Sequence, residues 1–230
     1  KEKWYDFAAA IPVNYLTAYF MLIHQSGLRK NEWVLIHGAG GGVGIASIQI
    51  AKIIGAKIIG TSSAWKHEKL KKIGVDYLID YNNQNFEDEV LEITSGRGVD
   101  VAIDSLGGKA LAQSYSSLSE FGRLVSYGFS SIAFGNKKNY LKILPEYFST
   151  PRFNPSNLMM ENRGVFGFHL GYLSKRHDLV KEYGNLIMDW LNAGKISPII
   201  DSTFNLKDAA HAHHYISSRK NFGKVLLSNK

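Results

Sequence analysis

The chain has 230 residues, of which 45% are hydrophobic, so it is long enough to bury a core of its own. It contains no cysteine, which excludes disulfides, a thiol nucleophile and cysteine-built zinc sites. The net charge is +7, but the one dense basic run, residues 66–72, alternates with apolar residues as a solvated helix face does. We therefore expect no nucleic acid partner. No long uninterrupted apolar run occurs, so we expect no membrane span and a cytoplasmic location.

Short β-branched runs alternate with helical stretches, which is the pattern of β-α units around a parallel sheet. The six predicted strands cover residues 33–36, 57–61, 77–79, 99–103, 123–127 and 164–168. The four helices predicted between them cover residues 43–54, 66–73, 86–94 and 109–118. Right-handed crossovers place helices on both faces of the sheet. The sequence therefore predicts an α/β fold with a doubly wound parallel sheet.

Two regions break this alternation. Residues 130–162 form a long connection rich in Asn, Lys, Pro and aromatic residues, which we interpret as a functional loop with a helix over 140–148. After a helical run at 179–192, Gly194 predicts a helix end and Pro198 an extended segment. The tail then predicts a strand near Ile199, a helix over 206–217 and a strand over 225–227. This order indicates a return to another structural unit.

A cluster of glycines lies where the first strand ends and a helix begins. Glycine permits positive φ and lets backbone N–H groups approach a diphosphate at a helix N-terminus. The cluster follows a strand within a β-α-β unit, as the pattern G-x-G-x-x-G requires, although an alanine takes the first position. A tight structural turn is the alternative. The residues predicted to bind the diphosphate in a Rossmann fold of strand order 3-2-1-4-5-6 are Ala39, Gly41, Gly42, Val43 and Gly44.

The end of the second strand indicates which dinucleotide is bound. NAD-binding folds usually carry an acid there, about twenty residues past the glycines, to hold the ribose 2′-hydroxyl. Here Ser62, Ser63 and Lys66 stand in its place. Hydroxyls and a lysine can donate to a 2′-phosphate, whereas a carboxylate would repel it. We therefore predict NADPH as the cofactor; the alternative for Lys66 is an exposed lysine in the first helical turn.

Several sequence blocks occur in a familiar order. They are AAAIPVNYLTAY at 8–19, VLIHGAGGGVG at 34–44, GVD at 74–76 with IDY at 79–81, GVD at 98–100 with DSLGG at 104–108, and GKVLL at 223–227. Together they resemble the zinc-free quinone oxidoreductases of the medium-chain dehydrogenase/reductase superfamily. Asn162 and Arg163 with GFHLGYL at 167–173 resemble the vesicle amine transport protein branch of that family.

The resemblance implies positions for further cofactor contacts. Ser62, Lys66 and Tyr81 would surround the adenosine 2′-phosphate, with Arg219 near it from the tail. The residues assigned in the same way to the nicotinamide side and the rest of the cofactor site are Leu106, Gly128, Phe166, Phe168 and Thr17. Core packing is the alternative for Tyr81, and a sheet edge the alternative for the strand at 164–168. In the family that edge, here from Gly164 to Phe168, pairs across a homodimer, and the two roles are compatible because alternate residues face opposite sides.

The chain departs from the family in one respect: members carry a further barrel-like domain ahead of the segment at 8–19. We therefore interpret the chain as a piece of a longer protein. Residues 1–196 would be the dinucleotide-binding domain, and residues 197–230 the return segment that completes the other domain. The resemblance implies a zinc-independent reductase that transfers hydride from NADPH to a quinone or an α,β-unsaturated carbonyl. No catalytic residue is assigned, and catalysis by this chain alone is doubtful.

Two competing interpretations remain. His211, His213 and His214 are weighed as metal ligands. His211 and His214 are three residues apart and could share a helix face, but no third ligand is evident, so the three are interpreted as ordinary helix residues and no metal is predicted. The chain could also be a non-enzymatic nucleotide-fold scaffold whose basic surface contacts RNA or membrane lipid. Against RNA, the basic run at 66–72 has no stacking residue beside it except Trp65.

Overall fold

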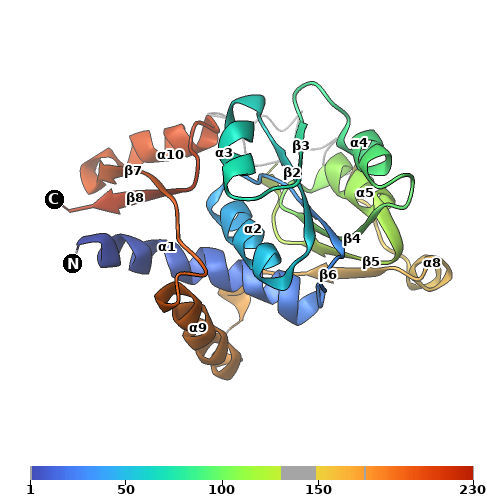
Figure 1. Cartoon of the computed structure of the whole chain (residues 1–230), viewed down its shortest axis with the longest axis horizontal. Helices are drawn as coiled ribbons and strands as arrows, with labels where there is room; N and C mark the ends of the chain where they lie inside the picture. The colour runs from blue at the N-terminus through green and yellow to red at the C-terminus, as the bar shows by residue number, and fades with distance from the viewer. Residues whose placement is uncertain (1, 131–148, 174, 230) are drawn as a thin grey trace.

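The computed structural model describes residues 2–130, 149–173 and 175–229 of the chain. Within them, six strands form one parallel sheet in the order β3-β2-β1-β4-β5-β6, so the predicted strand order is confirmed (Figure 1). The strands are β1 Trp33–Ile36, β2 Lys57–Ser62, β3 Tyr77–Asp80, β4 Val99–Asp104, β5 Leu118–Ser126 and β6 Gly164–Gly167. The order reverses between β1 and β4, where ligands bind in sheets of this kind.

Helices connect and cover these strands. They are α1 Glu2–Tyr19 with the π-helical turn η1 Phe20–Gln25, α2 Gly42–Ile54, η2 Ala64–Lys66, α3 His67–Lys72, α4 Phe86–Ile93, α5 Gly108–Ser116, α8 Pro155–Glu161, η3 Leu170–Tyr172 and α9 His177–Asn192. The predicted helix over 66–73 thus begins at His67, after a 3₁₀ turn. The predicted helix over 140–148 lies outside the described residues.

Strand β5 begins at Leu118, five residues before the predicted strand. Phe121 has a φ of 60°, and the pairing of β4 with β5 is irregular between Val99 and Val101. This irregularity interrupts the alternation of buried and exposed residues from which strands are predicted, so the first half of β5 is not visible in the sequence pattern.

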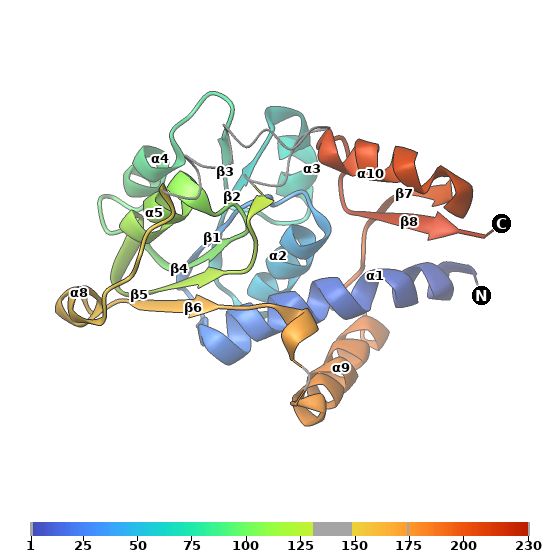
Figure 2. The same ribbon diagram turned by 180° about the vertical axis from the view of Figure 1, so that it is seen from behind.

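The sheet is buried on both faces. Alternate residues of β1 enter opposite apolar clusters: Val34 and Ile36 pack with α1, α2 and α9, and Leu35 packs with α4 and α5. Figures 1 and 2 show these two helical layers from opposite sides. Because each strand must be apolar on both faces, the sheet sequences read as nearly continuous hydrophobic runs.

Helix α1 and η1 lie on the same face of the sheet as α2 and α9. By length and composition alone, Trp4–Gln25 is apolar enough to span a membrane, with a hydropathy of 1.3, but 61% of that window is buried within the fold. Tyr15, which is 2% exposed, donates from its hydroxyl to Gln49 Oε1 on α2 at 2.8 Å. A helix that belongs to the core passes the same composition test, so this finding is weak evidence for a span.

The tail forms a small β-α-β unit from β7 Ile200–Asn205, η4 Leu206–Asp208, α10 Ala209–Ser217 and β8 Lys224–Ser228. Its strands and helix follow the predicted order, and the two strands are parallel. The unit is joined to the glycine-rich turn, because the Gly223 N–H donates to the Gly40 carbonyl at 2.9 Å. Figure 2 shows it beside the start of α1. The predicted domain boundary after residue 196 stays a prediction.

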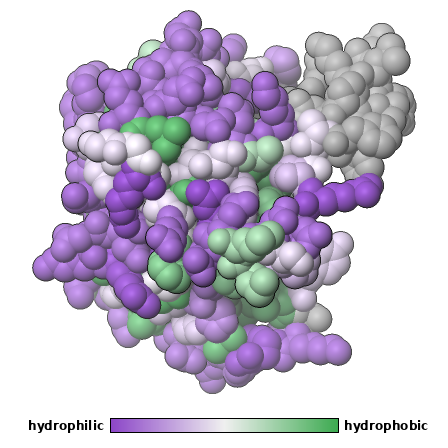
Figure 3. All heavy atoms as spheres, turned by 90° about the vertical axis from the view of Figure 1, so that its right-hand side faces the viewer, coloured by the Kyte–Doolittle hydropathy of each residue, from purple (hydrophilic) through white to green (hydrophobic). Residues whose placement is uncertain are grey.

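The face on the side of α4, α5 and α8 is mostly hydrophilic. Figure 3 shows this face, on which apolar side chains gather only in small groups between polar ones. Isolated apolar side chains are normal on a protein surface. This face therefore gives no indication of a large apolar contact.

Candidate cofactor site

The candidate site lies at the carboxyl ends of β1, β2 and β4. The turn after β1 has a glycine with positive φ at Gly38, 61°, and helix α2 begins after Gly41 without a side chain capping its first turn. A Cβ at Gly44 would lie 2.4 Å from the Gly38 carbonyl oxygen, closer than real contacts allow. Glycine at this position therefore lets α2 pack against the turn. Gly41 and Gly42, at the start of α2, line the crevice, so the free N–H groups of the first turn of the helix are available to a diphosphate.

A cavity of about 590 Å³ opens over this turn. Its walls come from the glycine turn, the ends of β2 and β3, the turn after β4, and the tail. The residues that line it are Gly38, Gly40, Gly41, Gly42, Thr61, Ser62, Ser63, Lys66, Tyr81, Gln84, Asn85, Phe86, Ser105, Leu106, Ala110, Gln113, Ser130, Ile216, Arg219 and Asn221. No carboxylate is among these described residues, whereas a lysine and an arginine are.

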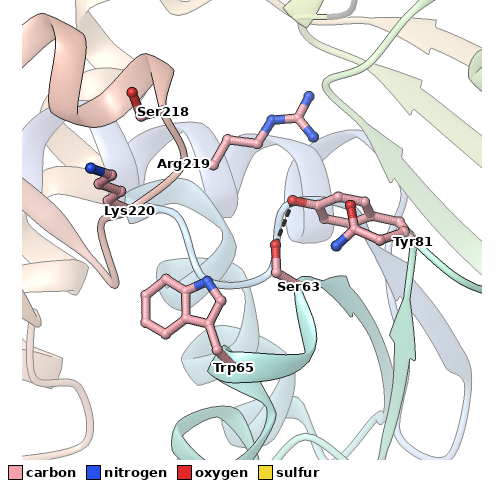
Figure 4. Close-up of a pocket in the computed structure, with 7 residues that line it drawn as sticks. Ser63, Trp65, Tyr81, Ser218, Arg219 and Lys220 are labelled. Atoms are coloured by element: carbon pink, nitrogen blue, oxygen red, sulfur yellow. Dashed lines mark hydrogen bonds between the residues drawn. The ribbon is translucent and has the colours of Figure 1, made fainter.

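The cations and hydroxyls gather at one end of this crevice, where a smaller cavity of about 340 Å³ adjoins it. Ser63 Oγ and Tyr81 Oη are 2.8 Å apart, and the Arg219 guanidinium lies 5.3 Å from the centre of the Tyr81 ring. Figure 4 shows that Ser63, just after β2, Tyr81, just after β3, and Arg219 of the tail lie close together. This arrangement presents donors and positive charge to an anion.

Lys66 is an unusual member of this group because its side chain is nearly buried, at 7% exposed. Burial lowers the Lys66 pKa, Arg219 and Lys69 lower it further by repulsion, and Asp201 opposes the shift. A buried ammonium beside other cations is costly unless a negative group accompanies it. The alternative of an exposed first-turn lysine is therefore wrong, since the side chain turns into the cavity wall.

A second cavity, of about 550 Å³, lies past the ends of β5 and β6. Gly128 and Phe168 line it, as does His169. Phe168 stacks on Phe20 with ring centres 5.4 Å apart. Its position beyond the switch point, on the side away from Ser63 and Tyr81, is where the second half of a dinucleotide would extend.

The structure brings most of the predicted site residues together. Gly41, Gly42, Ser62, Ser63, Lys66, Tyr81, Leu106 and Arg219 line the larger crevice, and Gly128 and Phe168 line the second cavity. Five line neither cavity. Ala39 is buried beneath the turn, Val43 and Gly44 are in the first turn of α2, Thr17 is 7% exposed on α1, and the fifth is Phe166. Phe166 packs against the core.

Sequence reasoning missed three lining residues that are informative. Thr61 and Phe86 lie on elements that were predicted, but nothing in a linear pattern shows which side chains face a crevice. Asn221 was missed because its role depends on how the tail folds back. Its side-chain amide donates at 2.9 Å to the carbonyl of Gly223, the residue that joins the tail to Gly40. The available signal was Gly223 itself, which has a φ of 105°.

The described residues offer no cluster of metal ligands. No group of three or more His, Asp or Glu side chains there could hold a metal ion. Helix α10 carries the three histidines weighed in the sequence, and none of them lines the crevice.

The crevice fits a nicotinamide dinucleotide phosphate by its donors and its space. The open first turn of α2 suits a diphosphate, and the packing at Gly44 leaves no room for any side chain there. At the other end, Lys66, Arg219 and the Ser63 hydroxyl supply charge and hydrogen bonds that suit a phosphate ester. Nothing in the lining would repel it.

Comparison with known proteins places this fold. A family model described as zinc-binding dehydrogenase matches residues 42–189. The chain belongs to this family, within the medium-chain dehydrogenase/reductase superfamily. It is 39% identical over 227 residues to a synaptic vesicle membrane protein VAT-1 homolog of Danio rerio, covering 98% of this chain and 47% of the relative. The resemblance to the superfamily and to its vesicle-protein branch is thus confirmed.

Solved structures agree. A quinone oxidoreductase of Pseudomonas syringae pv. Tomato superposes with a TM-score of 0.80 at 30% identity, covering 96% of this chain and 63% of that one. The mycobacterial protein Rv1454c complexed with NADPH superposes with a TM-score of 0.81 at 26% identity, covering 96% and 65%. The chain spans about half the length of the curated relatives it matches. Its fold is the dinucleotide-binding domain of oxidoreductase-like proteins.

Proposed function

We propose that this chain binds NADPH and serves as the cofactor half of a zinc-independent reductase. The observation that carries the proposal is a crevice at the switch point of the sheet that is lined by Lys66 and Arg219 and by no carboxylate among the described residues. A ribose 2′-hydroxyl is usually held by an acid, whereas a 2′-phosphate needs cations and hydroxyl donors. The NADPH complex of the similar mycobacterial structure supports this choice.

The reaction we propose is hydride transfer to a quinone or to the β-carbon of an α,β-unsaturated carbonyl. When bound, the reduced nicotinamide would supply the hydride. The chain's own residues would hold the diphosphate at the α2 N-terminus and the 2′-phosphate at Lys66 and Arg219. The wall formed by Gly128 and Phe168 would border the ring and exclude water. The similarity to a quinone oxidoreductase supports the acceptor class.

Zinc independence is part of the same proposal. The chain contains no cysteine, and its described residues contain no cluster able to hold a metal. A quinone needs no metal to accept hydride, because its own carbonyls delocalise the negative charge. We further propose a homodimer that pairs through the edge strand from Gly164 to Phe168, and a cytoplasmic location.

The test is a calorimetric titration of the chain with NADPH and with NADH. We expect a clear preference for NADPH in the wild type. Lys66→Ala should weaken NADPH binding about 10-fold to 100-fold, the effect of losing one charge-assisted hydrogen bond, and leave NADH almost unchanged. Lys72→Ala, which removes the same charge from an exposed position on α3, is the matched control.

A different function would give a different result. The similarity to vesicle membrane proteins favours, as the second candidate, a scaffold that binds lipid through its basic surface. Salt-sensitive binding to anionic vesicles without binding of either dinucleotide would support that candidate and contradict the reductase proposal. Equal affinity for NADPH and NADH would contradict the assignment of Lys66.

A further inference from the structure

Beneath the crevice, four buried polar side chains form a continuous hydrogen-bonded chain. His37 Nδ1 lies 3.0 Å from Thr61 Oγ1, and His37 Nε2 lies 2.9 Å from Ser114 Oγ. Ser114 Oγ in turn donates to Asp104 Oδ2 at 2.7 Å. All four residues are at most 1% exposed. None of them takes part in the proposed contacts to the phosphates, so their burial needs another explanation.

The donors and acceptors along this hydrogen-bonded chain determine which nitrogen of His37 must carry a proton. Because the Ser114 hydroxyl donates its hydrogen bond to Asp104, Ser114 Oγ can only accept from His37, which requires a proton on His37 Nε2. A neutral ring then offers a lone pair at Nδ1, and the Thr61 hydroxyl donates to it. Burial also lowers the His37 pKa, and the nearby Asp104 opposes this shift. The neutral Nε2–H tautomer therefore satisfies every member of the chain.

These four hydrogen-bonded side chains connect three walls of the crevice. His37 directly precedes the glycine turn, and Thr61 directly precedes Ser62 and Ser63. The other oxygen of Asp104 accepts from the backbone N–H groups of Leu106, at 2.7 Å, and Gly107, at 2.8 Å. It thereby fixes the turn that carries Ser105 and Leu106 into the cavity. Ser114 anchors all three to helix α5.

We infer that the buried chain of Thr61, His37, Ser114 and Asp104 sets the affinity of the crevice for its dinucleotide by holding the ends of β1, β2 and β4 in register. These are positioning residues, because Ser114 and Asp104 do not line the cavity and act on it only through the residues to which they are hydrogen-bonded. The inference rests on the proposed function for the ligand, but the hydrogen-bond chain itself is testable without any ligand. A preformed crevice binds more tightly because it loses less conformational freedom on binding.

The first measurement concerns the histidine alone. Nitrogen NMR shifts of the His37 ring in the free chain distinguish a protonated from an unprotonated ring nitrogen. We expect a neutral ring with its proton on Nε2 across the neutral pH range. A proton on Nδ1, or on both nitrogens, would contradict the hydrogen bonds assigned to His37, whatever ligand the protein binds.

The second measurement uses Ser114→Ala, with Ser117→Ala as the matched control. Both serines are fully buried on or next to α5, but the Ser117 hydroxyl donates only to the Gln113 carbonyl of its own helix. Ser114→Ala should weaken NADPH binding about tenfold, within the range known for residues that act at a distance from the ligand. It should also speed hydrogen exchange at the amides of Leu106 and Gly107 in the free chain. Ser117→Ala should do neither.

A second pair of variants, both at Thr61, tests the same inference if Ser114→Ala does not fold. Thr61→Val removes the hydroxyl while keeping the shape, and Thr61→Ser keeps the hydroxyl. Weaker NADPH binding by the valine variant with recovery in the serine variant supports the inference.

The outcomes separate the two proposals. Faster exchange at Leu106 and Gly107 with unchanged NADPH affinity would overturn the inference and leave the proposed function standing. Failure of the wild type to bind any nicotinamide dinucleotide would overturn both. Equal loss of affinity in Ser114→Ala and Ser117→Ala would reduce the effect to lost helix stability and overturn the inference alone.

Discussion

Lys66 is the residue at which the proposed selectivity can be tested by pH. Its pKa lies below the ordinary 10.5 because the side chain is buried beside Arg219 and Lys69. A bound 2′-phosphate would favour the charged form and raise that pKa again. Binding at alkaline pH must therefore take up a proton, and uptake of a proton on binding makes affinity fall as pH rises.

We accordingly expect the affinity for NADPH to begin falling at a pH below 10.5. The affinity should also fall at acid pH, because the 2′-phosphate takes up a second proton at a pH of about 6. Calorimetry between these limits measures both slopes. Lys66→Ala should lose the alkaline slope and keep the acid one. An alkaline slope of equal size in the variant would assign the effect to another group.

For single residues, the sequence predicts which side chains suit a phosphate but not which distant side chains contact one another. Ser62, Ser63 and Lys66 were predictable because they replace an acid at a known distance from the glycines. The buried contact of His37 with Ser114 was not, since these residues are 77 positions apart and meet only when β1 and α5 pack. Linear spacing identifies a site on one segment, whereas a buried network joins several.

Strand β6 is the element that bears on assembly. In the part of the chain that the structure describes, β6 pairs with β5 alone, and no strand pairs with its other edge. The Phe168 N–H donates to the Ser126 carbonyl at 2.9 Å, whereas the Gly167 carbonyl accepts from the side chain of Gln25 at 3.1 Å. Backbone groups alternate in direction along a strand, so Val165, like Gly167, turns its N–H away from β5.

Val165→Pro should therefore weaken the proposed homodimer without disturbing the pairing of β6 with β5. A twofold interface loses the same donor twice, which at about 1 kcal/mol each corresponds to a dissociation constant raised at least about tenfold. Sedimentation velocity over a range of concentrations measures it. Val165→Ala keeps the N–H group and should stay dimeric. A wild type that sediments as a monomer at every concentration would refute the dimer itself.

The elements were also the most predictable level of the fold. Six strands and the helices between them follow from alternating β-branched and helical patterns, and the strand order follows from assigning the glycine-rich turn to a Rossmann fold. What escaped was the start of β5, where Phe121 at positive φ breaks the alternation. A pattern read from sequence assumes regular backbone, and this strand is irregular.

At the scale of the whole molecule, the crevice depends on a joint between the tail and the glycine turn. Gly223 takes a φ of 105°, and a Cβ there would lie 2.4 Å from the Ile199 carbonyl oxygen. Alanine at this position is therefore strained twice, by its backbone angle and by its contact. The hydrogen bond from Gly223 to Gly40 would be lost if the backbone shifts.

Gly223→Ala should consequently lower NADPH affinity about tenfold or more, because Arg219 and Asn221 would leave the crevice wall. Gly184→Ala on α9 is the matched control, since a Cβ there meets nothing within 4 Å. Isothermal titration gives both affinities, and far-ultraviolet circular dichroism checks that the sheet remains folded. Unchanged affinity in Gly223→Ala would mean that the tail contributes nothing to binding.

The joint between Gly40 and Gly223 also bears on the order in which the protein becomes functional during synthesis. Chains emerge from the ribosome N-terminus first, and regions that can fold do so as they appear. The glycine turn, β2 and the turn after β4 all precede residue 110, whereas Arg219 and Gly223 follow more than a hundred residues later. A nascent chain can thus form most of the sheet well before its crevice has a complete wall. Under the proposed function, the crevice for NADPH is therefore complete only after the tail has been made.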